Sequence, residues 1–318
     1  MTRLSTMQPF APGDVFLGLT DLDDPTDDHK GPGRIVQYDA DLKKKGELWT
    51  VGGEHLVGGL NFGPDGLLWA FNDLSVLHVD PKTGRQLPLS TKFRPRVYRS
   101  ASFGPDGSVY LGEHMLAKDP PPGIEKLTTV KFPRLPDTGW LGHGQIHHYD
   151  RNWTLQHEWD VDHAQELTGF KGVTHHTLHP SGRSIAYTAE TSKRIMRFDV
   201  VNGRQLPDLV RYPGDNIRDG NWVIALRYRP DGTLLATRSK TMDLIDETGR
   251  TIREYSLGDT YGWAEVMPMR DPRYVLLANI WTGIAGRYDL ERGEFAATID
   301  TGFTAPRRSL AGIAEYPG

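Results

Sequence analysis

Three histidines lie close together in the stretch GVTHHTLHPSGRSIAY, residues 172–187. Imidazole titrates near neutral pH and also binds transition metals, so these side chains are candidates for acid–base chemistry or for metal binding. Successive side chains of a β-strand point to opposite faces, so one chemical centre rarely uses both members of an adjacent pair. We therefore expect three environments: His175 in a site, His176 in packing and His179 in a solvated turn.

A repeated pattern of short apolar runs predicts the fold around these histidines. Each repeat has an apolar run, a Pro/Asp/Gly turn that signals a hairpin, and a second apolar run. The repeats begin at Leu60, Ala101, Thr177, Leu226 and Val266. A third strand ending in Asp and a fourth strand follow most of them, so each unit is predicted to be a four-stranded antiparallel meander. Radial repetition of such sheets is the β-propeller pattern.

The two ends of the chain complete the number of blades. PGDVFLGLTD at 12–21 has the pattern of a second strand without a first, and LAGIAEYPG at 310–318 that of a first strand without a second. Their pairing would close one sheet and remove exposed edges. The sequence predicts an all-β, six-bladed β-propeller, as one domain over residues 1–318, and a β-sandwich is the alternative. The predicted blades begin near residues 14, 58, 99, 173, 223 and 264.

An insertion at residues 115–144 separates the second and third strands of the third blade. A segment of this length without strands is unusual and is often a lid or a binding loop. We therefore expect the insertion to lie over the mouth of the central channel.

The composition limits the partners of the protein. The 318 residues include no cysteine, which excludes a disulfide framework and a thiolate nucleophile, and the net charge of −4 gives no footprint for nucleic acid or an anionic membrane. No apolar run approaches the ~20 residues that span a bilayer, and the N-terminus lacks the apolar region of a secretory signal. We expect a cytoplasmic protein with a small-molecule substrate, and the sequence does not give its oligomeric state.

Alignment of the first strands by their turns identifies candidate catalytic residues. The column that contains His175 is otherwise made mostly of small residues, so its imidazole is expected to project into free space. One position earlier, Arg99 and Glu265 stand out. We predict that His175 is a general base, that Glu265 orients it or acts as the acid, and that Arg99 holds a carboxylate or a developing oxyanion. The column with His176 is otherwise apolar, which predicts packing between blades.

Further polar and aromatic side chains gather on the same predicted end of the blades. Candidates for contacts with an aromatic substrate are Trp222, Tyr261, Trp263, Trp281 and, from the insertion, His143. A metal-free acid–base site is consistent with these side chains. The Asp-rich stretch 21–28 lacks the EF-hand glycine and terminal glutamate, so a solvated loop is expected there.

The repeat, which covers nearly the whole chain, resembles the broad group of six-bladed propeller enzymes. This group includes gluconolactonase and diisopropylfluorophosphatase-like hydrolases, strictosidine synthase-like proteins and NHL-type lyases. The gluconolactonase group implies calcium in the column of Glu265, where Arg99 would repel a cation. The lyase-like group implies zinc bound by histidines from separate blades, here His114 and His175 with Glu265 or His55. One divalent metal, if present, is therefore expected to be zinc or another histidine-bound metal in preference to calcium.

Two function hypotheses follow from these observations. The first is a hydrolase or lyase that acts on an anionic or aromatic small molecule, with or without a divalent metal. The second is a non-catalytic propeller that binds a protein partner through the same face. Docking faces are usually depleted of charge at their centre, whereas His, Glu and Arg converge here, and this favours the enzyme.

Overall fold

The chain folds almost entirely into antiparallel β-sheets. The computed structural model describes residues 3–55, 57–126, 128–136, 138–164, 170–190, 192–214, 220–302 and 310–318. These residues form six four-stranded sheets, which are the blades of a six-bladed β-propeller, and one two-stranded sheet. The predicted fold class is confirmed, and each predicted blade start lies within two residues of the first residue of a strand.

The contacts between Cα atoms divide the chain into two compact units. Unit 1 comprises Met1–Tyr98, Thr128–Pro133 and Met267–Gly318, and unit 2 comprises Arg99–Leu127 and Arg134–Val266. Each unit is described by itself below. The expectation of one domain over residues 1–318 stays a prediction.

The hairpin turns follow from the Pro/Asp/Gly chemistry of the repeat. The side chains of Asp65, Asp106 and Asp231 accept hydrogen bonds from the backbone amide two residues further on, which fixes each turn locally. The glycine after each of these turn residues has a φ between 78° and 85°, a conformation that glycine adopts without a steric penalty. The repeat therefore sets the register of the first two strands of a blade.

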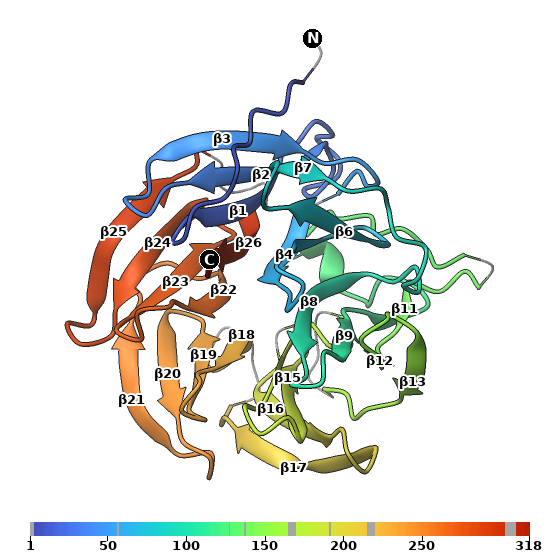
Figure 1. Ribbon diagram of the computed structural model, residues 1–318. Coiled ribbons are helices and arrows are strands. Elements are labelled where there is room, and N and C mark those ends of the chain that lie inside the picture. The colour runs from blue at the N-terminus through green and yellow to red at the C-terminus, as the bar shows by residue number, and fades with distance from the viewer. Residues whose placement is uncertain are drawn as a thin grey trace. The chain divides into compact units, whose positions relative to one another are not determined.

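Unit 1 holds the blade that joins the two ends of the chain. β1 pairs on one side with β2 and on the other with β26, as Figure 1 shows, so the predicted closure is confirmed. The strands of this blade, in sheet order, are β26 (Leu310–Glu315), β1 (Val15–Thr20), β2 (Gly33–Tyr38) and β3 (Lys44–Trp49). Those of the next blade are β4 (Val57–Phe62), β5 (Leu68–Asn72), β6 (Ser75–Asp80) and β7 (Arg85–Gln86).

Unit 2 holds three further blades, whose outer strands β13, β17 and β21 are labelled in Figure 1. The first has the sheet order β13 (Leu155–Trp159), β12 (Ile146–Tyr149), β9 (Val109–Glu113) and β8 (Tyr98–Phe103). The second contains β14 (His175–Leu178), β15 (Ser184–Thr188), β16 (Arg194–Asp199) and β17 (Arg204–Arg211). The third contains β18 (Val223–Tyr228), β19 (Leu234–Arg238), β20 (Thr241–Ile245) and β21 (Thr251–Ser256).

The sixth blade begins in unit 2 and continues in unit 1. Its strands are β22 (Trp263–Pro268), β23 (Tyr274–Asn279), β24 (Ile284–Asp289) and β25 (Glu294–Asp300). The boundary between the units falls inside β22, after Val266, so the first four residues of this strand belong to unit 2.

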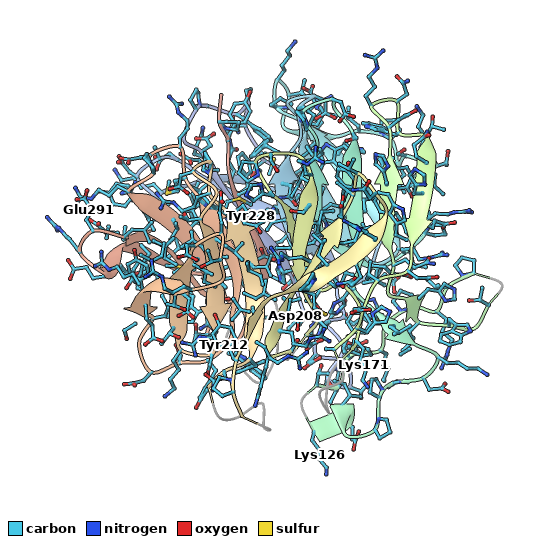
Figure 2. The ribbon with its side chains drawn as sticks, turned by 90° about the horizontal axis from the view of Figure 1, so that it is seen from below. Lys126, Lys171, Asp208, Tyr212, Tyr228 and Glu291 are labelled. Carbon is cyan, nitrogen blue, oxygen red and sulfur yellow. The ribbon has the colours of Figure 1, made fainter. Side chains whose placement is uncertain are left out.

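The insertion differs from the strandless loop that the sequence predicts. It begins and ends with two short paired strands, β10 (Leu116–Ala117) and β11 (Gly142–His143), and it contains the 3₁₀ turn η1 (Ile124–Lys126). Strand pairing satisfies backbone groups that a free loop would expose, which explains why the base of the insertion is ordered. In Figure 2, Lys126 and Lys171 lie toward the same end of unit 2, away from Tyr228 near a hairpin turn. The predicted position over a channel mouth stays a prediction.

The core of each unit lies between neighbouring blades. In unit 2, Tyr110 and Ile146 of one blade pack with Ile185 and Tyr187 of the next. β9 and β15 are buried on both faces, so both faces of these strands carry apolar side chains. In the part of the chain that the structure describes, no helix has the length and hydrophobicity that a membrane crossing requires.

Candidate active site

The structure brings the three predicted catalytic residues together within unit 2. Arg99 is the second residue of β8, His175 is the first residue of β14, and Glu265 is the third residue of β22. The Nε2 atom of His175 lies 3.8 Å from the Oε1 atom of Glu265. The side chains are buried, with exposed fractions of 9% for Arg99 and 2% for each of the other two residues.

A fourth side chain, Arg227 of β18, belongs to the same cluster. Its guanidinium acts electrostatically on both Glu265 and His175, as does that of Arg99. Arg227 is partly exposed as a residue, although its Nε atom is buried. The cluster therefore combines one imidazole and one carboxyl with two guanidiniums.

These four side chains have buried polar atoms without hydrogen bonds. Arg99 Nε, His175 Nε2, Arg227 Nε and Glu265 Oε1 have no hydrogen-bond partner among the described residues. An unsatisfied buried polar group destabilises a fold by about 1–3 kcal/mol, and most native groups of this kind are paired. Four such atoms in one cluster therefore call for a partner from outside the described residues, such as water, an ion or a ligand.

The charges of the cluster shift its acid and its base in opposite directions. Burial raises the pKa of Glu265 to about 8, against the opposing effect of Arg99 and Arg227. Burial, reinforced by the positive charges of Arg99 and Arg227, holds the pKa of His175 well below its usual value. At neutral pH the carboxyl is therefore protonated and the imidazole is neutral, so a proton donor and a proton acceptor face each other.

His114 and Glu190 form the next layer of polar groups. His114 Nε2 lies 3.7 Å from Glu190 Oε2, and its Nδ1 lies 3.1 Å from Thr174 Oγ1. The Glu190 side chain is 26% exposed and acts electrostatically on Arg99. Glu190 and Arg227 are therefore the partly exposed members of this set, whereas Arg99, His175 and Glu265 are buried.

The neighbouring histidines have the structural environments that the sequence predicts. His176 is 1% exposed, its Nδ1 lies 3.1 Å from Ser102 Oγ, and its Nε2 lies 3.0 Å from the Ser100 carbonyl oxygen. A Cβ atom at Gly112 would lie 2.7 Å from His176 Cδ2, so glycine there leaves room for the ring. The His179 Nδ1 lies 2.8 Å from Ser181 Oγ in the turn.

The predicted substrate-contacting residues differ in their environments. Tyr261 is 43% exposed, and Lys240 Nζ lies 4.9 Å from the centre of its ring. Trp263 is 4% exposed and its carbonyl accepts a hydrogen bond from Thr237. His143 of the insertion contacts the ring of Trp140.

Two tryptophans from the same predicted set lie in different units. Trp222 belongs to unit 2, where it is partly exposed and has a buried, unpaired Nε1 atom. Trp281 lies in unit 1, in the turn between β23 and β24, and its backbone amide donates to Asn279. Contacts of Trp222, Tyr261, Trp263, Trp281 and His143 with a substrate stay predictions.

The residues around His175 do not fit a divalent cation. Two guanidiniums act on this imidazole, and their positive charge disfavours a second cation nearby. His114 and His175 belong to no group of three ligand atoms within 4.8 Å of one another in the described ranges, and His55 lies in unit 1. The positive charges therefore favour the metal-free alternative at this cluster, and metal binding by His114, His175 and His55 stays a prediction.

Arg227 is the residue of the cluster that sequence reasoning missed. Aligned by its turn, it falls in a column with Asn61, Ser102 and Thr177, two positions after the column of His175. A long charged side chain among short polar ones is the same signal that identified His175, so the second column on this strand face would have revealed it. A register shift between Val223 and Ala225 of β18 also limits alignment by turns alone.

Unit 1 contains a second group of histidines and carboxylates. Ligand atoms of Asp27, Asp28 and His29 lie within 4.8 Å of one another, and all three residues are largely buried. The solvated loop expected at residues 21–28 is therefore wrong for Asp27, whose exposed fraction is 1%. The physical reason is the pairing described next, which compensates the buried charge.

The imidazole of His55 joins this group to a third carboxylate. Its Nε2 lies 3.0 Å from Asp27 Oδ2 and its Nδ1 lies 2.6 Å from Asp73 Oδ1. Burial lowers the pKa of His55, but the carboxylates of Asp73 and Asp27 outweigh burial and raise it above its usual value.

Comparisons with known proteins agree with the propeller fold. No family model and no curated protein matches the sequence. The chain is similar to a solved structure described as a nidogen/laminin complex, with 10% identity, a TM-score of 0.60, and coverage of 95% of this chain and 97% of that one. A protein of unknown function from Bacteroides caccae has 12% identity, a TM-score of 0.60, and coverage of 95% and 98%.

A third solved structure is virginiamycin B lyase from Staphylococcus aureus. It has 14% identity, a TM-score of 0.49, and coverage of 79% of this chain and 71% of that one. At these identities the comparisons show the fold alone. The function must be argued from the site.

Proposed function

We propose that this protein is a small-molecule enzyme of the hydrolase or lyase class that works by acid–base catalysis at His175 and Glu265. The observation that carries the proposal is the buried, unpaired contact of 3.8 Å between His175 Nε2 and Glu265 Oε1. A neutral imidazole can accept a proton, and a protonated carboxyl can donate one, at the same pH.

In a hydrolysis, His175 takes a proton from water, and the resulting hydroxide adds to a lactone or ester carbonyl. Arg99 stabilises the oxyanion that develops on the carbonyl oxygen. Glu265 donates its proton to the alkoxide that leaves as the carbon–oxygen bond breaks. The His175 imidazolium then returns its proton to the Glu265 carboxylate, which restores both groups.

In an elimination, the same two residues act on different atoms. His175 takes a proton from carbon, the electron pair forms a double bond, and the carbon–oxygen bond breaks. Glu265 protonates the departing oxygen, and proton return from His175 again restores the site. The two reactions are distinguished by their products, an acid with an alcohol in the first and an unsaturated product in the second.

The test is a screen of lactones, esters and small hydroxy acids, followed by variants of the two adjacent histidines. We expect His175→Ala to lower kcat by about 10²–10⁴-fold, because general acid–base catalysis contributes rate factors of this size. His176→Ala is the matched control, since its ring packs against Ser102 and Ser100. It is expected to lower the melting temperature and to leave the kcat of the folded protein within a few-fold.

Equal turnover by wild type and folded His175→Ala would contradict the proposal. Loss of a protein partner with no turnover on any substrate would instead support the alternative of a binding propeller. Metal removal by chelation is expected to leave turnover unchanged, because the cluster does not offer a cation site.

A further inference from the structure

Arg99 and Arg227 set the electrostatic character of the cluster. Their guanidiniums stay protonated in proteins, and each has a buried Nε atom that donates to no described residue. Burial of an uncompensated charge is unfavourable, so a buried guanidinium normally has an oxyanion partner. The two side chains come from different blades, β8 and β18, and both act on Glu265.

The ionised groups of the cluster leave an excess of positive charge. Arg99 and Arg227 supply two positive charges. Glu190 supplies one negative charge, and Glu265 supplies none while it is protonated. One monoanion would therefore neutralise the cluster, whereas a phosphate dianion would leave a net negative charge. Guanidinium groups match the planar, two-oxygen geometry of a carboxylate.

We infer that the cluster binds a small carboxylate between Arg99 and Arg227, whose buried Nε atoms donate to no described residue. The inference rests on the proposed function, because it names a carboxylate-bearing molecule as the substrate class of the same site. It also assigns Arg227 as a residue that determines specificity.

Carboxylate binding is expected to depend on the protonation of the Glu265 carboxyl, because of the groups that face it. They are His175 of β14, at 3.8 Å, and the guanidiniums of Arg99 from β8 and Arg227 from β18, which act on Glu265 electrostatically. One step further out, His114 and His176 act on His175, and Glu190 acts on Arg99. An ionised Glu265 would attract both guanidiniums to itself and repel a second carboxylate. A protonated Glu265 leaves the guanidiniums to the ligand and can donate a hydrogen bond to it.

The test is calorimetric titration of the folded protein with acetate and with benzoate between pH 6 and pH 9.5. We expect constant affinity up to about pH 7, followed by a loss that approaches tenfold per pH unit above the pKa of Glu265, which is about 8. Glu265→Gln keeps the shape of the protonated acid, so this variant is expected to bind with little pH dependence. Inorganic phosphate is the comparison anion and is expected to bind more weakly.

Two arginine variants test the assignment of the guanidiniums. Arg227→Met and Arg99→Met are each expected to weaken carboxylate binding at least about tenfold, because each removes a charged hydrogen-bond donor. Arg229→Met is the matched control. Its guanidinium lies 3.2 Å from Asp231 in the turn after β18, so its loss is expected to leave affinity unchanged.

The following outcomes would overturn the inference. They are failure of both carboxylates to bind folded wild type, equal binding by the Arg99 and Arg227 variants, tighter binding of phosphate, and pH-independent binding by wild type. The proposed function fails separately: carboxylate binding without turnover of any substrate would contradict the enzyme and leave the anion site in place. Turnover without carboxylate binding would support the enzyme and contradict the anion site.

Discussion

Two buried groups of histidine and carboxylate in this protein differ in how their polar atoms are paired. In unit 1, each ring nitrogen of His55 lies within 3.0 Å of a carboxylate oxygen, from Asp27 or Asp73. In unit 2, His175 and Glu265 approach only to 3.8 Å, and neither of the facing atoms has a hydrogen bond. The same residue types therefore form close ion-pair contacts of 2.6 Å and 3.0 Å in one unit and a looser contact of 3.8 Å in the other.

The pKa values of the two histidines, His55 and His175, are shifted in opposite directions. The pKa of His55 is raised, because the carboxylates of Asp73 and Asp27 outweigh the effect of burial. The pKa of His175 is lowered, because burial and two guanidiniums both disfavour its charged form. Because a buried polar group without a hydrogen bond destabilises a fold, the unit 2 group is expected to be the less stabilising of the two.

The largest expected effect is on the free energy of unfolding, when one carboxyl group is removed from each of the two groups. Asp27→Ala leaves the buried ring of His55 with one carboxylate partner fewer, and breaking a buried pair destabilises a protein by about 3–5 kcal/mol. Glu265→Leu removes an unpaired buried carboxyl, so the free energy of unfolding is expected to stay within about 1 kcal/mol of wild type or to rise. Urea unfolding at pH 7 measures both. Equal destabilisation by the two variants would contradict the expected difference in stability between the two groups.

The pH dependence of the free energy of unfolding also distinguishes the two groups. Glu265 has a folded-state pKa near 8 and an unfolded value near 4.5, so its favourable contribution is complete below 4.5 and is lost as pH rises to about 8. The difference in unfolding free energy between wild type and Glu265→Gln is expected to fall by up to about 1.4 kcal/mol per pH unit between pH 5 and pH 8. A difference that stays flat over this interval would contradict the buried, protonated state.

His55 gives a different pH interval. Its pKa is raised above the usual histidine value of 6.5, so its contribution to stability is complete below 6.5 and is lost as pH rises through the raised pKa. The difference between wild type and His55→Gln is therefore expected to be flat at pH 5–6 and to fall above pH 6.5. A loss of stability on acidification in this comparison would show that His55 is buried neutral.

The adjacent histidines of β14 give a smaller effect on stability. His176→Ala is expected to lower the free energy of unfolding by about 1–3 kcal/mol, because it leaves buried partners such as Ser102 Oγ with one contact fewer. Its affinity for acetate is expected to equal that of wild type. His175→Ala is expected to show the reverse, with lost turnover and a smaller change in melting temperature. Circular dichroism and calorimetry compare the two.

The smallest expected effect concerns the insertion segment that contacts the unit 1 group. Thr128 Oγ1 donates to Asp28 Oδ1 over 2.7 Å, so Thr128→Val is expected to lower the free energy of unfolding by about 1 kcal/mol. Lys131→Ala is the control, because its backbone amide still donates to Asp27 after the side chain is removed. An equal loss in the control would assign the effect to the segment as a whole.

Much of the fold was predictable because its determinants are local. Asp65, Asp106 and Asp231 fix hairpin turns with hydrogen bonds that span two residues, and the repeat of these turns predicts the blades. The closure of β1 with β26 was predictable because each end of the chain lacks the strand that the other end supplies. The paired base of the insertion was missed, since two-residue strands carry no periodic signal.

The candidate site was predictable only in part. Arg99, His175 and Glu265 lie on first strands, where the register relative to a turn shows an unusual side chain. The group around His55 was missed because Asp27, Asp73 and Thr128 come from loops and turns of different length. No sequence periodicity relates such positions, so their contacts follow only from the folded chain.

Both proposals require a Glu265 carboxyl that is buried, unpaired and protonated at neutral pH. The most direct measurement is a carbon-13 NMR titration of the glutamate carboxyl signals between pH 5 and pH 10, with Glu265→Gln used to assign the signal. We expect one carboxyl that is protonated at pH 7 and titrates near pH 8, and we expect its pKa to rise when acetate is bound. A Glu265 signal that is already ionised at pH 7, with a pKa near 4.5 and no response to acetate, would contradict it.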